Sequence, residues 1–275
     1  MIKYPNTYFN IKDTLDCGQV FRFKPYKNGF LSFALDHCAY VYEEGGYIVV
    51  DGDDDGFWYG YFDLGENYAA IVDKILSCGV DKVTYACKAY KGIRILRQSK
   101  YEAFISFIIS QNNNIPRIKS IIERVCAALG EKKTFKGIEY NAFPTLENLA
   151  TAGEDLFTSL GLGYRAEYVN KAAISLLSGE IDLEYLSTLP PFELKQALLI
   201  IKGVGNKVAD CTLHFGFHKT DAFPVDTWIE KLYHEDFDGK LTDRKKISEY
   251  FVSLFGEYAG LVQQYLFHAK RMNNL

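Results

Sequence analysis

Hydrophobic and polar residues alternate along much of the first fifty residues, and this two-residue period predicts β-strands. The expected strands are rich in Phe, Tyr and Val, and the turn-forming pairs Asn28-Gly29 and Gly45-Gly46 separate some of them. They cover residues 19–24, 29–35, 38–43 and 47–50. We therefore predict an antiparallel sheet in the N-terminal part of the chain.

Helical periodicity begins near Tyr68 and covers nearly all of the chain after Ser99. Ser99 and Glu102 have the spacing of a capping box, and Pro116 and Pro191 stand where further helices are expected to begin. The predicted fold class is α+β. An antiparallel sheet domain over residues 1–95 precedes a mostly α-helical region over residues 96–275.

The bulk composition is that of a globular protein. Of the 275 residues, 48% are hydrophobic, and no apolar run approaches the roughly 18 residues needed to cross a bilayer. With no signal peptide at the start, we expect a cytoplasmic protein that does not act at a membrane. The six cysteines form no CxxC pair and no cluster, so we expect no metal site made of side chains.

The net charge of -4 is unevenly distributed. Residues 1–90 hold 8 basic and 13 acidic side chains, whereas residues 91–136 hold 10 basic and 3 acidic ones. A local excess of Lys and Arg attracts phosphate groups, because each phosphate contact releases counterions. Residues 91–136 are therefore a candidate nucleic-acid surface, and the alternative is a solvated helical face.

A glycine turn separates two apolar helical patterns in residues 199–210, which read LIIKGVGNKVAD. Gly203 and Gly205, on either side of Val204, permit positive φ angles and let a phosphate approach the backbone. The helix that follows offers unpaired N–H groups and the positive end of its dipole to the same anion. The sequence predicts a phosphate-binding hairpin, although a GxG alone is also typical of a simple tight turn.

Lys207 falls in the first turn of the second helix, where the helix dipole and burial both disfavour a charged ammonium. An uncharged lysine amine is a nucleophile. Asp226 follows nineteen residues later at a predicted helix N-cap, and Pro224 fixes an extended approach to it. Taken singly, Lys207 has the alternative of a phosphate contact, and Asp226 that of a cap without chemistry.

Together, GVGxKxAD and the later PVD resemble the helix-hairpin-helix, Gly/Pro-Asp superfamily of DNA glycosylases over roughly residues 99–270. The resemblance implies that Lys207 attacks the anomeric carbon of a flipped nucleotide and that Asp226 supports the cationic transition state and proton transfers. It implies a Schiff base, β-elimination and strand nicking. It also implies two helical lobes with the catalytic cleft between them.

Further strings resemble the 8-oxoguanine branch of this superfamily and extend the resemblance over nearly the whole chain. From SQNNNIPR, it implies that Asn112 enters the gap left by the flipped nucleotide and that Arg117 reads the orphaned cytosine. From GLGYR, it implies Tyr164 as a wedge between bases and Arg165 as another cytosine contact. Without the resemblance, the Asn triplet is typical of a helix cap, and Tyr-Arg pairs are common on surfaces.

Recognition of 8-oxoguanine depends on a hydrogen at N7, where guanine has a lone pair that no carbonyl can bind. The string CGQVFR resembles the family segment whose glycine carbonyl accepts that hydrogen, which implies Gly18. Gln263 and Phe267 share one helical face, and the resemblance implies that they bind the Watson–Crick edge and stack on the base opposite Cys211. Otherwise Gly18 would start a strand, and Phe267 and Cys211 would be ordinary core residues.

Two positions depart from the family pattern: Trp228 stands where some relatives have a phosphate-binding histidine, and Lys270 where some have an acidic residue. No cofactor is expected, although a monovalent cation at hairpin backbone carbonyls is consistent with the resemblance. The expected partner is double-stranded DNA containing 8-oxoguanine, bound by a monomer that is nucleoid-associated if the source is prokaryotic.

The resemblance thus implies a bifunctional DNA glycosylase/AP lyase that excises 8-oxoguanine opposite cytosine in base excision repair. Because the superfamily motif is shared, a glycosylase for other oxidised or alkylated bases remains an alternative. A non-catalytic DNA-binding hairpin module is another, and it predicts salt-sensitive binding without any product.

Overall fold

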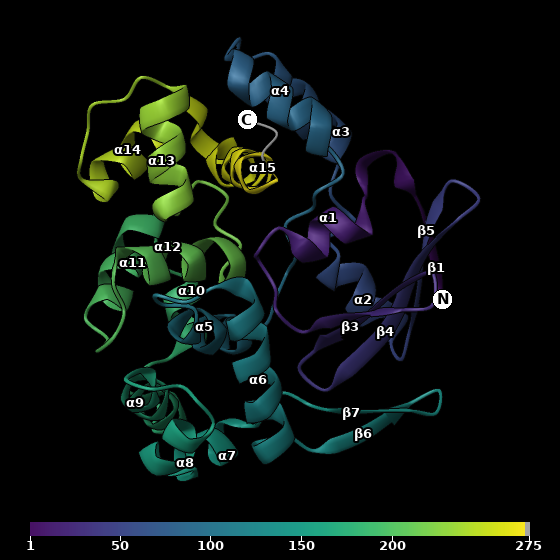
Figure 1. Ribbon diagram of the computed structural model, residues 1–275, viewed down its shortest axis with the longest axis vertical. Coiled ribbons are helices and arrows are strands. Elements are labelled where there is room, and N and C mark those ends of the chain that lie inside the picture. Colours follow the sequence, from purple (N-terminus) through teal and green to yellow (C-terminus); the bar gives the residue numbers. More distant parts are fainter. Residues whose placement is uncertain (273–275) are drawn as a thin grey trace.

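A five-stranded antiparallel sheet forms one side of the molecule in the computed structural model, which describes residues 1–272 (Figure 1). The strands lie in the order β1-β5-β4-β3-β2. Their bounds are Ile2–Pro5 (β1), Phe23–Tyr26 (β2), Gly29–Ala34 (β3), His37–Glu44 (β4) and Tyr47–Gly52 (β5). The predicted N-terminal antiparallel sheet is confirmed. Its β4–β5 turn uses Gly45 and Gly46 with φ of 59° and 83°, since a type I′ turn needs positive φ at both central positions.

The first predicted strand, residues 19–24, is shorter in the structure, because β2 begins only at Phe23. The Gln19 side chain is fully buried, and its Nε2 donates to the carbonyls of Thr14 at 2.9 Å and Arg94 at 2.8 Å. These bonds hold residues 19–22 as an irregular segment. Gly18, directly before Gln19, is thereby fixed in place.

Helices supply most of the remaining structure. Those before residue 91 are Ile11–Asp16 (α1), Asp55–Tyr61 (α2), Tyr68–Leu76 (α3) and Asp81–Tyr90 (α4), with a 3-10 turn at Asn6–Tyr8 (η1). Helical structure near Tyr68 is confirmed, because α3 begins there. The short helices α1 and α2, of 6 and 7 residues, are too brief for periodicity to reveal.

Beyond residue 91 the chain is largely helical. The α-helices are Lys100–Ile109 (α5), Ile115–Leu129 (α6), Leu146–Thr151 (α7), Gly153–Ser159 (α8), Arg165–Leu177 (α9), Leu183–Ser187 (α10), Pro191–Leu199 (α11), Asn206–Cys211 (α12), Thr227–Asp236 (α13), Arg244–Phe255 (α14) and Ala259–Arg271 (α15). A π-helical turn follows at Thr212–Gly216 (η2) and a 3-10 turn at Gly256–Tyr258 (η3). Pro116 and Pro191 lie in the first turns of α6 and α11, as predicted.

Helix α5 begins directly after Ser99, but the predicted capping box is wrong. Ser99 makes no side-chain capping bond. Glu102 instead accepts a hydrogen bond from the Leu35 N–H at 2.6 Å and pairs with Arg22 at 3.1 Å, and both charged side chains are buried. Removing one partner of a buried ion pair costs about 3–5 kcal/mol. The Arg22–Glu102 pair therefore stabilises the packing of the sheet against the helical region.

A second, two-stranded sheet interrupts the helical region, where nearly continuous helix was predicted. It consists of Lys132–Phe135 (β6) and Ile138–Asn141 (β7). Lys136 and Gly137 have φ of 50° and 79°, so they form the tight turn. Phe135 packs with Leu31 and Phe33, which places this hairpin against the main sheet (Figure 1).

The sheet and the helices have separate apolar cores. Trp58 and Leu15, from α2 and α1, pack with Val41 and Val50 of the sheet. A larger core joins the helices from α3 to α15, and α4 packs against both α3 and α15 (Figure 1). The domain division at residues 95 and 96 stays a prediction. None of the helices in residues 1–272 is both long and apolar enough to cross a membrane.

Candidate active site

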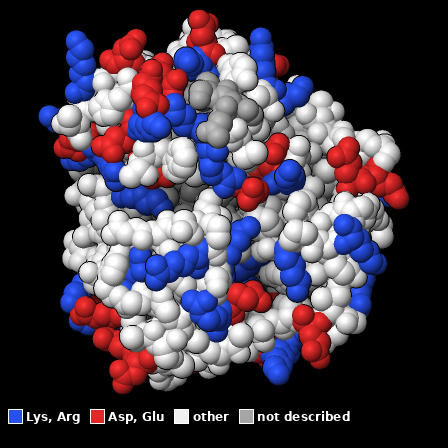
Figure 2. All heavy atoms as spheres, viewed as in Figure 1, with Lys and Arg blue, Asp and Glu red and all other residues white. Residues whose placement is uncertain are grey.

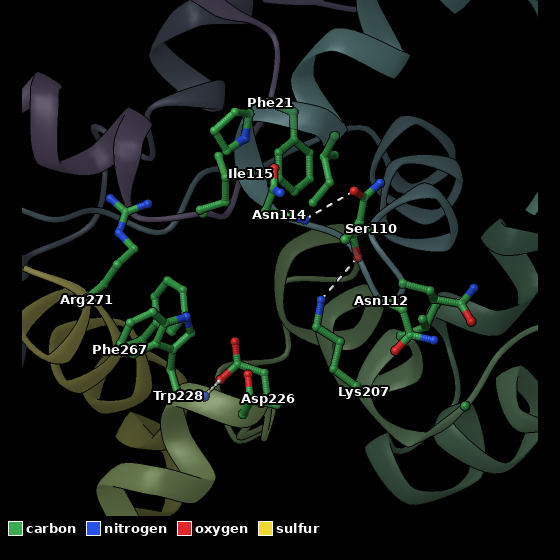
Figure 3. Close-up of a pocket in the computed structure, with 18 of the residues that line it drawn as sticks. Phe21, Ser110, Asn112, Asn114, Ile115, Lys207, Asp226, Trp228, Phe267 and Arg271 are labelled. Carbon is green, nitrogen blue, oxygen red and sulfur yellow. Dashed lines mark hydrogen bonds between the residues drawn. The ribbon is translucent and has the colours of Figure 1, made fainter. Parts of the chain in front are cut away.

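A cavity of about 560 Å³ opens where the α5–α6 junction, α12, the start of α13 and the end of α15 approach one another (Figure 3). Its walls come from segments that are far apart in the sequence. Six of the predicted site residues line it: Gly18, Asn112, Gly205, Lys207, Asp226 and Phe267. The nucleophile and the carboxylate inferred from the sequence therefore share one open space.

The glycine turn between α11 and α12 places Lys207 at this cavity. Gly203 has φ of 86°, and a Cβ added there would lie 2.3 Å from the Tyr168 ring. Only Gly203 needs a left-handed conformation, since Gly205 has φ of -94° and serves as the N-cap of α12. Val204 is buried between them. This corrects the expectation that both glycines supply positive φ angles.

The Lys207 side chain points into the cavity, and none of the described residues forms an ion pair with it. Its Nζ donates a hydrogen bond to Ser110 Oγ at 3.1 Å and lies 5.5 Å from the centre of the Phe107 ring. In residues 1–272, no carboxylate lies within ion-pair distance of this nitrogen. The amine is thus held in place by a neutral hydroxyl.

Asp226 caps helix α13, as predicted. One carboxylate oxygen, Oδ1, accepts the backbone N–H groups of Trp228 and Ile229, each at 3.0 Å. The other oxygen has no hydrogen-bond partner in the described part of the chain, and Figure 3 shows the carboxylate directed toward the open space. The capping role and the chemical role are compatible, because each uses a different oxygen.

A smaller adjoining cavity, of about 50 Å³, contains the predicted base-recognition residues. Gly18 has φ of 87°, and a Cβ added there would lie 3.2 Å from the Phe267 ring. The absence of a side chain at Gly18 therefore lets its backbone approach the ring closely. Gly18 does not start a strand, because β2 begins five residues later.

Cys211 and Gln263 complete this smaller cavity. Burial raises the pKa of the Cys211 thiol to about 11, while the positive charge of Lys207 opposes the shift, so the thiol is uncharged at neutral pH. Gln263 is buried and donates to the Pro224 carbonyl at 3.2 Å, and its Oε1 accepts from Gln264 at 2.5 Å. These two bonds leave one N–H and one oxygen lone pair of the Gln263 amide for an incoming base.

The predicted wedge residues lie together at the rim. Asn112 is exposed, has φ of 45°, and its Nδ2 donates to the hydroxyl of Tyr164 at 3.1 Å. Tyr164 is 51% exposed, as a side chain that inserts between bases must be. Arg117 is exposed, and its guanidinium has no hydrogen-bond or ion-pair partner within residues 1–272, so its donors are available to a ligand.

Arg165 differs from Arg117 because it is only 4% exposed. Its guanidinium donates to the backbone carbonyls of Gln111, Asn112 and Leu162. It also lies 4.4 Å from the centre of the Tyr164 ring. These bonds hold the turn that carries Asn112, and the cytosine contact inferred for Arg165 stays a prediction.

Some residues that line the cavity were not predicted from the sequence. Ser110 and Arg271 line the cavity, and Arg271 donates to Asp16 Oδ2 at 3.1 Å. Ser110 belongs to the SQNNNIPR string and Arg271 lies one helical turn after Phe267, but neither spacing shows that the residue lines a cavity.

The two positions that depart from the family pattern lie in different places. Trp228, 40% exposed, lies at the rim of the cavity. Lys270 lies outside the cavity lining and pairs with Glu235 and Asp236 at 2.9 and 2.6 Å.

Basic side chains gather on the face that carries the cavity. Figure 2 shows Lys and Arg around a hollow across the middle of this face, with most acidic side chains nearer its edges. Not every basic residue in the stretch 91–136 contributes to this basic surface, because Arg94 is fully buried and donates to the carbonyls of Phe62 and Tyr8.

Within residues 1–272, no cluster of three or more His, Cys, Asp or Glu could hold a metal ion. A monovalent cation at the hairpin carbonyls stays a prediction.

Comparison with known families divides the chain into two matched segments. Residues 105–256 match the HhH-GPD superfamily base excision DNA repair protein, and residues 1–104 match the 8-oxoguanine DNA glycosylase, N-terminal domain.

Individual relatives agree with these matches. A probable N-glycosylase/DNA lyase from Methanothermobacter thermautotrophicus is 33% identical over 231 residues, which cover 76% of this chain and 72% of the relative. The structure of Clostridium acetobutylicum 8-oxoguanine glycosylase/lyase in complex with dsDNA containing cytosine opposite to 8-oxoG superposes with a TM-score of 0.92 at 36% identity, covering 98% and 93% of the two chains. The 3-methyladenine DNA-glycosylase from Archaeoglobus fulgidus, at 20% identity and a TM-score of 0.80, shares the fold.

Proposed function

The chain belongs to the HhH-GPD superfamily of base excision DNA repair proteins, with an 8-oxoguanine DNA glycosylase N-terminal domain, and we propose that Lys207 and Asp226 carry out its chemistry. It is an N-glycosylase/DNA lyase that removes 8-oxoguanine opposite cytosine from duplex DNA in base excision repair. The N-glycosidic bond lies inside the duplex, so the damaged nucleotide must flip into the cavity before it can react. The cavity is complete within one chain, which supports action as a monomer.

The observation that carries the assignment of residues is the shared cavity. The Lys207 amine and the free oxygen of Asp226 face the same space, and no ion pair within residues 1–272 occupies the amine. A carboxylate beside the sugar stabilises the positive charge that develops on it as the base departs. An amine that is uncharged can then supply the electron pair for the new bond.

The reaction follows in balanced steps. The Lys207 nitrogen forms a bond to C1′ while the bond from C1′ to the base breaks, and the base leaves with the electron pair and gains a proton. The attached nitrogen then loses one proton, and its lone pair forms the C1′=N bond while the C1′–O4′ bond breaks and O4′ gains a proton, which gives a protonated Schiff base and an open sugar ring. A proton then leaves C2′, and the bond from C3′ to the 3′ phosphate oxygen breaks with the phosphate as the leaving group. Asp226 is suitably placed to accept or return these protons.

Base recognition is proposed to use the smaller cavity. Phe267 and Cys211 line it together, so a flipped base would lie between a ring and an uncharged thiol, and these walls must move apart to admit it because the cavity is only about 50 Å³. The Gly18 carbonyl would accept the N7 hydrogen that distinguishes 8-oxoguanine from guanine, and Gln263 would pair with the Watson–Crick edge. Leaving a buried polar group without its hydrogen bond costs about 1–3 kcal/mol, so several contacts must act together to exclude guanine.

Comparing lesions tests this recognition. We expect excision from duplexes with 8-oxoguanine opposite cytosine, and none from duplexes with guanine or 3-methyladenine at the same position. Gln263→Ala should slow excision of 8-oxoguanine roughly 10- to 100-fold, because it removes the amide that pairs with the base edge. Single-turnover base release measures both effects. Equal excision of 3-methyladenine, or unchanged rates in Gln263→Ala, would contradict the proposed pocket.

The opposite-base preference gives a second test, measured with 8-oxoguanine opposite each of the four bases. Arg117→Ala should slow excision opposite cytosine most, because the exposed guanidinium of Arg117 is available for bidentate pairing. Arg165→Ala should slow excision opposite all four bases alike, because Arg165 supports the turn that carries Asn112. A loss confined to cytosine in Arg165→Ala would instead establish Arg165 as a reader of that base.

A further inference from the structure

Ser110 lies directly after α5, at the back of the cavity, and is only 5% exposed. Its hydroxyl donates to the Phe107 carbonyl at 2.8 Å. The same oxygen accepts a hydrogen bond from Lys207 Nζ at 3.1 Å. Ser110 therefore connects the last turn of one helix to the nucleophile on another.

The bond to Phe107 determines what Ser110 can do for Lys207. A serine hydroxyl has one hydrogen and two lone pairs. Because the hydrogen is engaged by the Phe107 carbonyl, only a lone pair is left for Lys207, so the lysine must direct an N–H toward Ser110. The lone pair of an uncharged amine then points away from Ser110.

The groups around Lys207 show which part of the cavity the lone pair of its amine faces. In Figure 3, Ser110 lies beyond the Lys207 nitrogen, whereas Asp226 lies across the open part of the cavity. The Phe107 ring lies under the same amine. The Cys211 thiol is also near enough to interact with Lys207, but a thiol is a weak hydrogen-bond partner.

We propose that Ser110 is a positioning residue, which holds the Lys207 amine by one N–H so that its lone pair faces the space where the sugar carbon of a flipped nucleotide would lie. This inference rests on the proposed role of Lys207 as the nucleophile. Ser110 takes no proton and forms no covalent bond in the reaction. Its effect is on the orientation of the attacking atom, where small displacements slow a reaction strongly.

The test compares Ser110→Ala with the unmodified protein under single-turnover conditions at saturating 8-oxoguanine duplex. We expect the rates of base release and of borohydride trapping to fall by the same factor, roughly 10- to 100-fold, with unchanged affinity for the duplex. The deficit should persist at alkaline pH, because the loss is one of orientation and not of deprotonation. Ser110→Thr, which keeps a hydroxyl, should recover most of the rate.

Ser106→Ala is the matched control, because Ser106 is a buried serine one turn earlier on α5 and lines none of the cavities described above. It should leave the rate unchanged, and thermal unfolding should show that each variant is folded. If Ser110→Ala does not fold, Ser110→Cys keeps the shape of the side chain while weakening the acceptor, and it should show the same deficit.

Three outcomes would overturn the proposal: full activity in Ser110→Ala or its Cys substitute, recovery of the rate at alkaline pH, or an equal loss in Ser106→Ala. The proposal and the assignment of Lys207 can fail separately. If the unmodified protein forms no adduct at Lys207, the nucleophile is wrong. If it does, and Ser110→Ala forms the adduct at the same rate, only the role of Ser110 is wrong.

Discussion

Lys207→Gln should abolish the borohydride-trapped protein–DNA adduct and strand nicking, while binding to 8-oxoguanine duplex remains. The glutamine amide nitrogen is not a nucleophile, so no bond to the sugar can form. The side chain of Lys207 makes no ion pair in residues 1–272, so its replacement leaves no buried charge unpaired. Denaturing gels resolve the adduct and the nicked strand, and a mobility-shift assay measures binding.

Lys231→Gln is a suitable control, because it removes the same charge from α13 on a side chain that is 58% exposed and lines none of the described cavities. It should trap and nick at the unmodified rate. A trapped adduct in Lys207→Gln would show that another amine attacks the sugar.

Asp226→Asn should lower the rate of base release by about 10²- to 10³-fold, because a neutral amide stabilises the developing sugar cation far less than a carboxylate does. Stability should change little. Asparagine caps helices about as well as aspartate, and its side-chain oxygen can still accept the N–H groups of Trp228 and Ile229. Single-turnover kinetics measure the rate, and thermal unfolding measures the stability.

The N-cap of α14 provides a matched control for Asp226. Asp243 accepts the Lys245 N–H at 2.8 Å and lines none of the described cavities. Asp243→Asn should therefore leave both the rate and the unfolding temperature nearly unchanged. If Asp226→Asn excises 8-oxoguanine at the normal rate, the carboxylate charge has no part in the chemistry.

The sequence alone indicates the two residues that we propose as the reacting pair, because its signals are local. The glycine turn fixes where α12 begins, and hence the turn that carries Lys207. The Pro-Val-Asp string fixes Asp226 as the N-cap of α13. Each signal concerns a few neighbouring residues and a backbone conformation with few alternatives, and the resemblance to a family supplied the inference that the two meet.

Features that depend on tertiary contacts are those that the sequence does not reveal. Glu102 has the spacing of a capping residue, but it pairs with Arg22, 80 residues away. Gln19 looks like part of a strand, yet its buried amide bonds to residues of two other segments. The contact between Ser110 and Lys207 cannot be predicted from the sequence for the same reason, because it forms only when α5 packs beside α12. The buried state of Arg165 likewise follows from the Gln111–Asn112 turn that it supports, and not from its position in the GLGYR string.

Locating the adduct on the unmodified protein tests the central claim most directly. The protein is incubated with 8-oxoguanine duplex and borohydride, the covalent complex is digested with nuclease and protease, and mass spectrometry identifies the residue that carries the sugar remnant. We predict that the remnant is attached to Lys207. A remnant on the N-terminal amine or on another lysine, or active base release without any adduct, would contradict attack by Lys207.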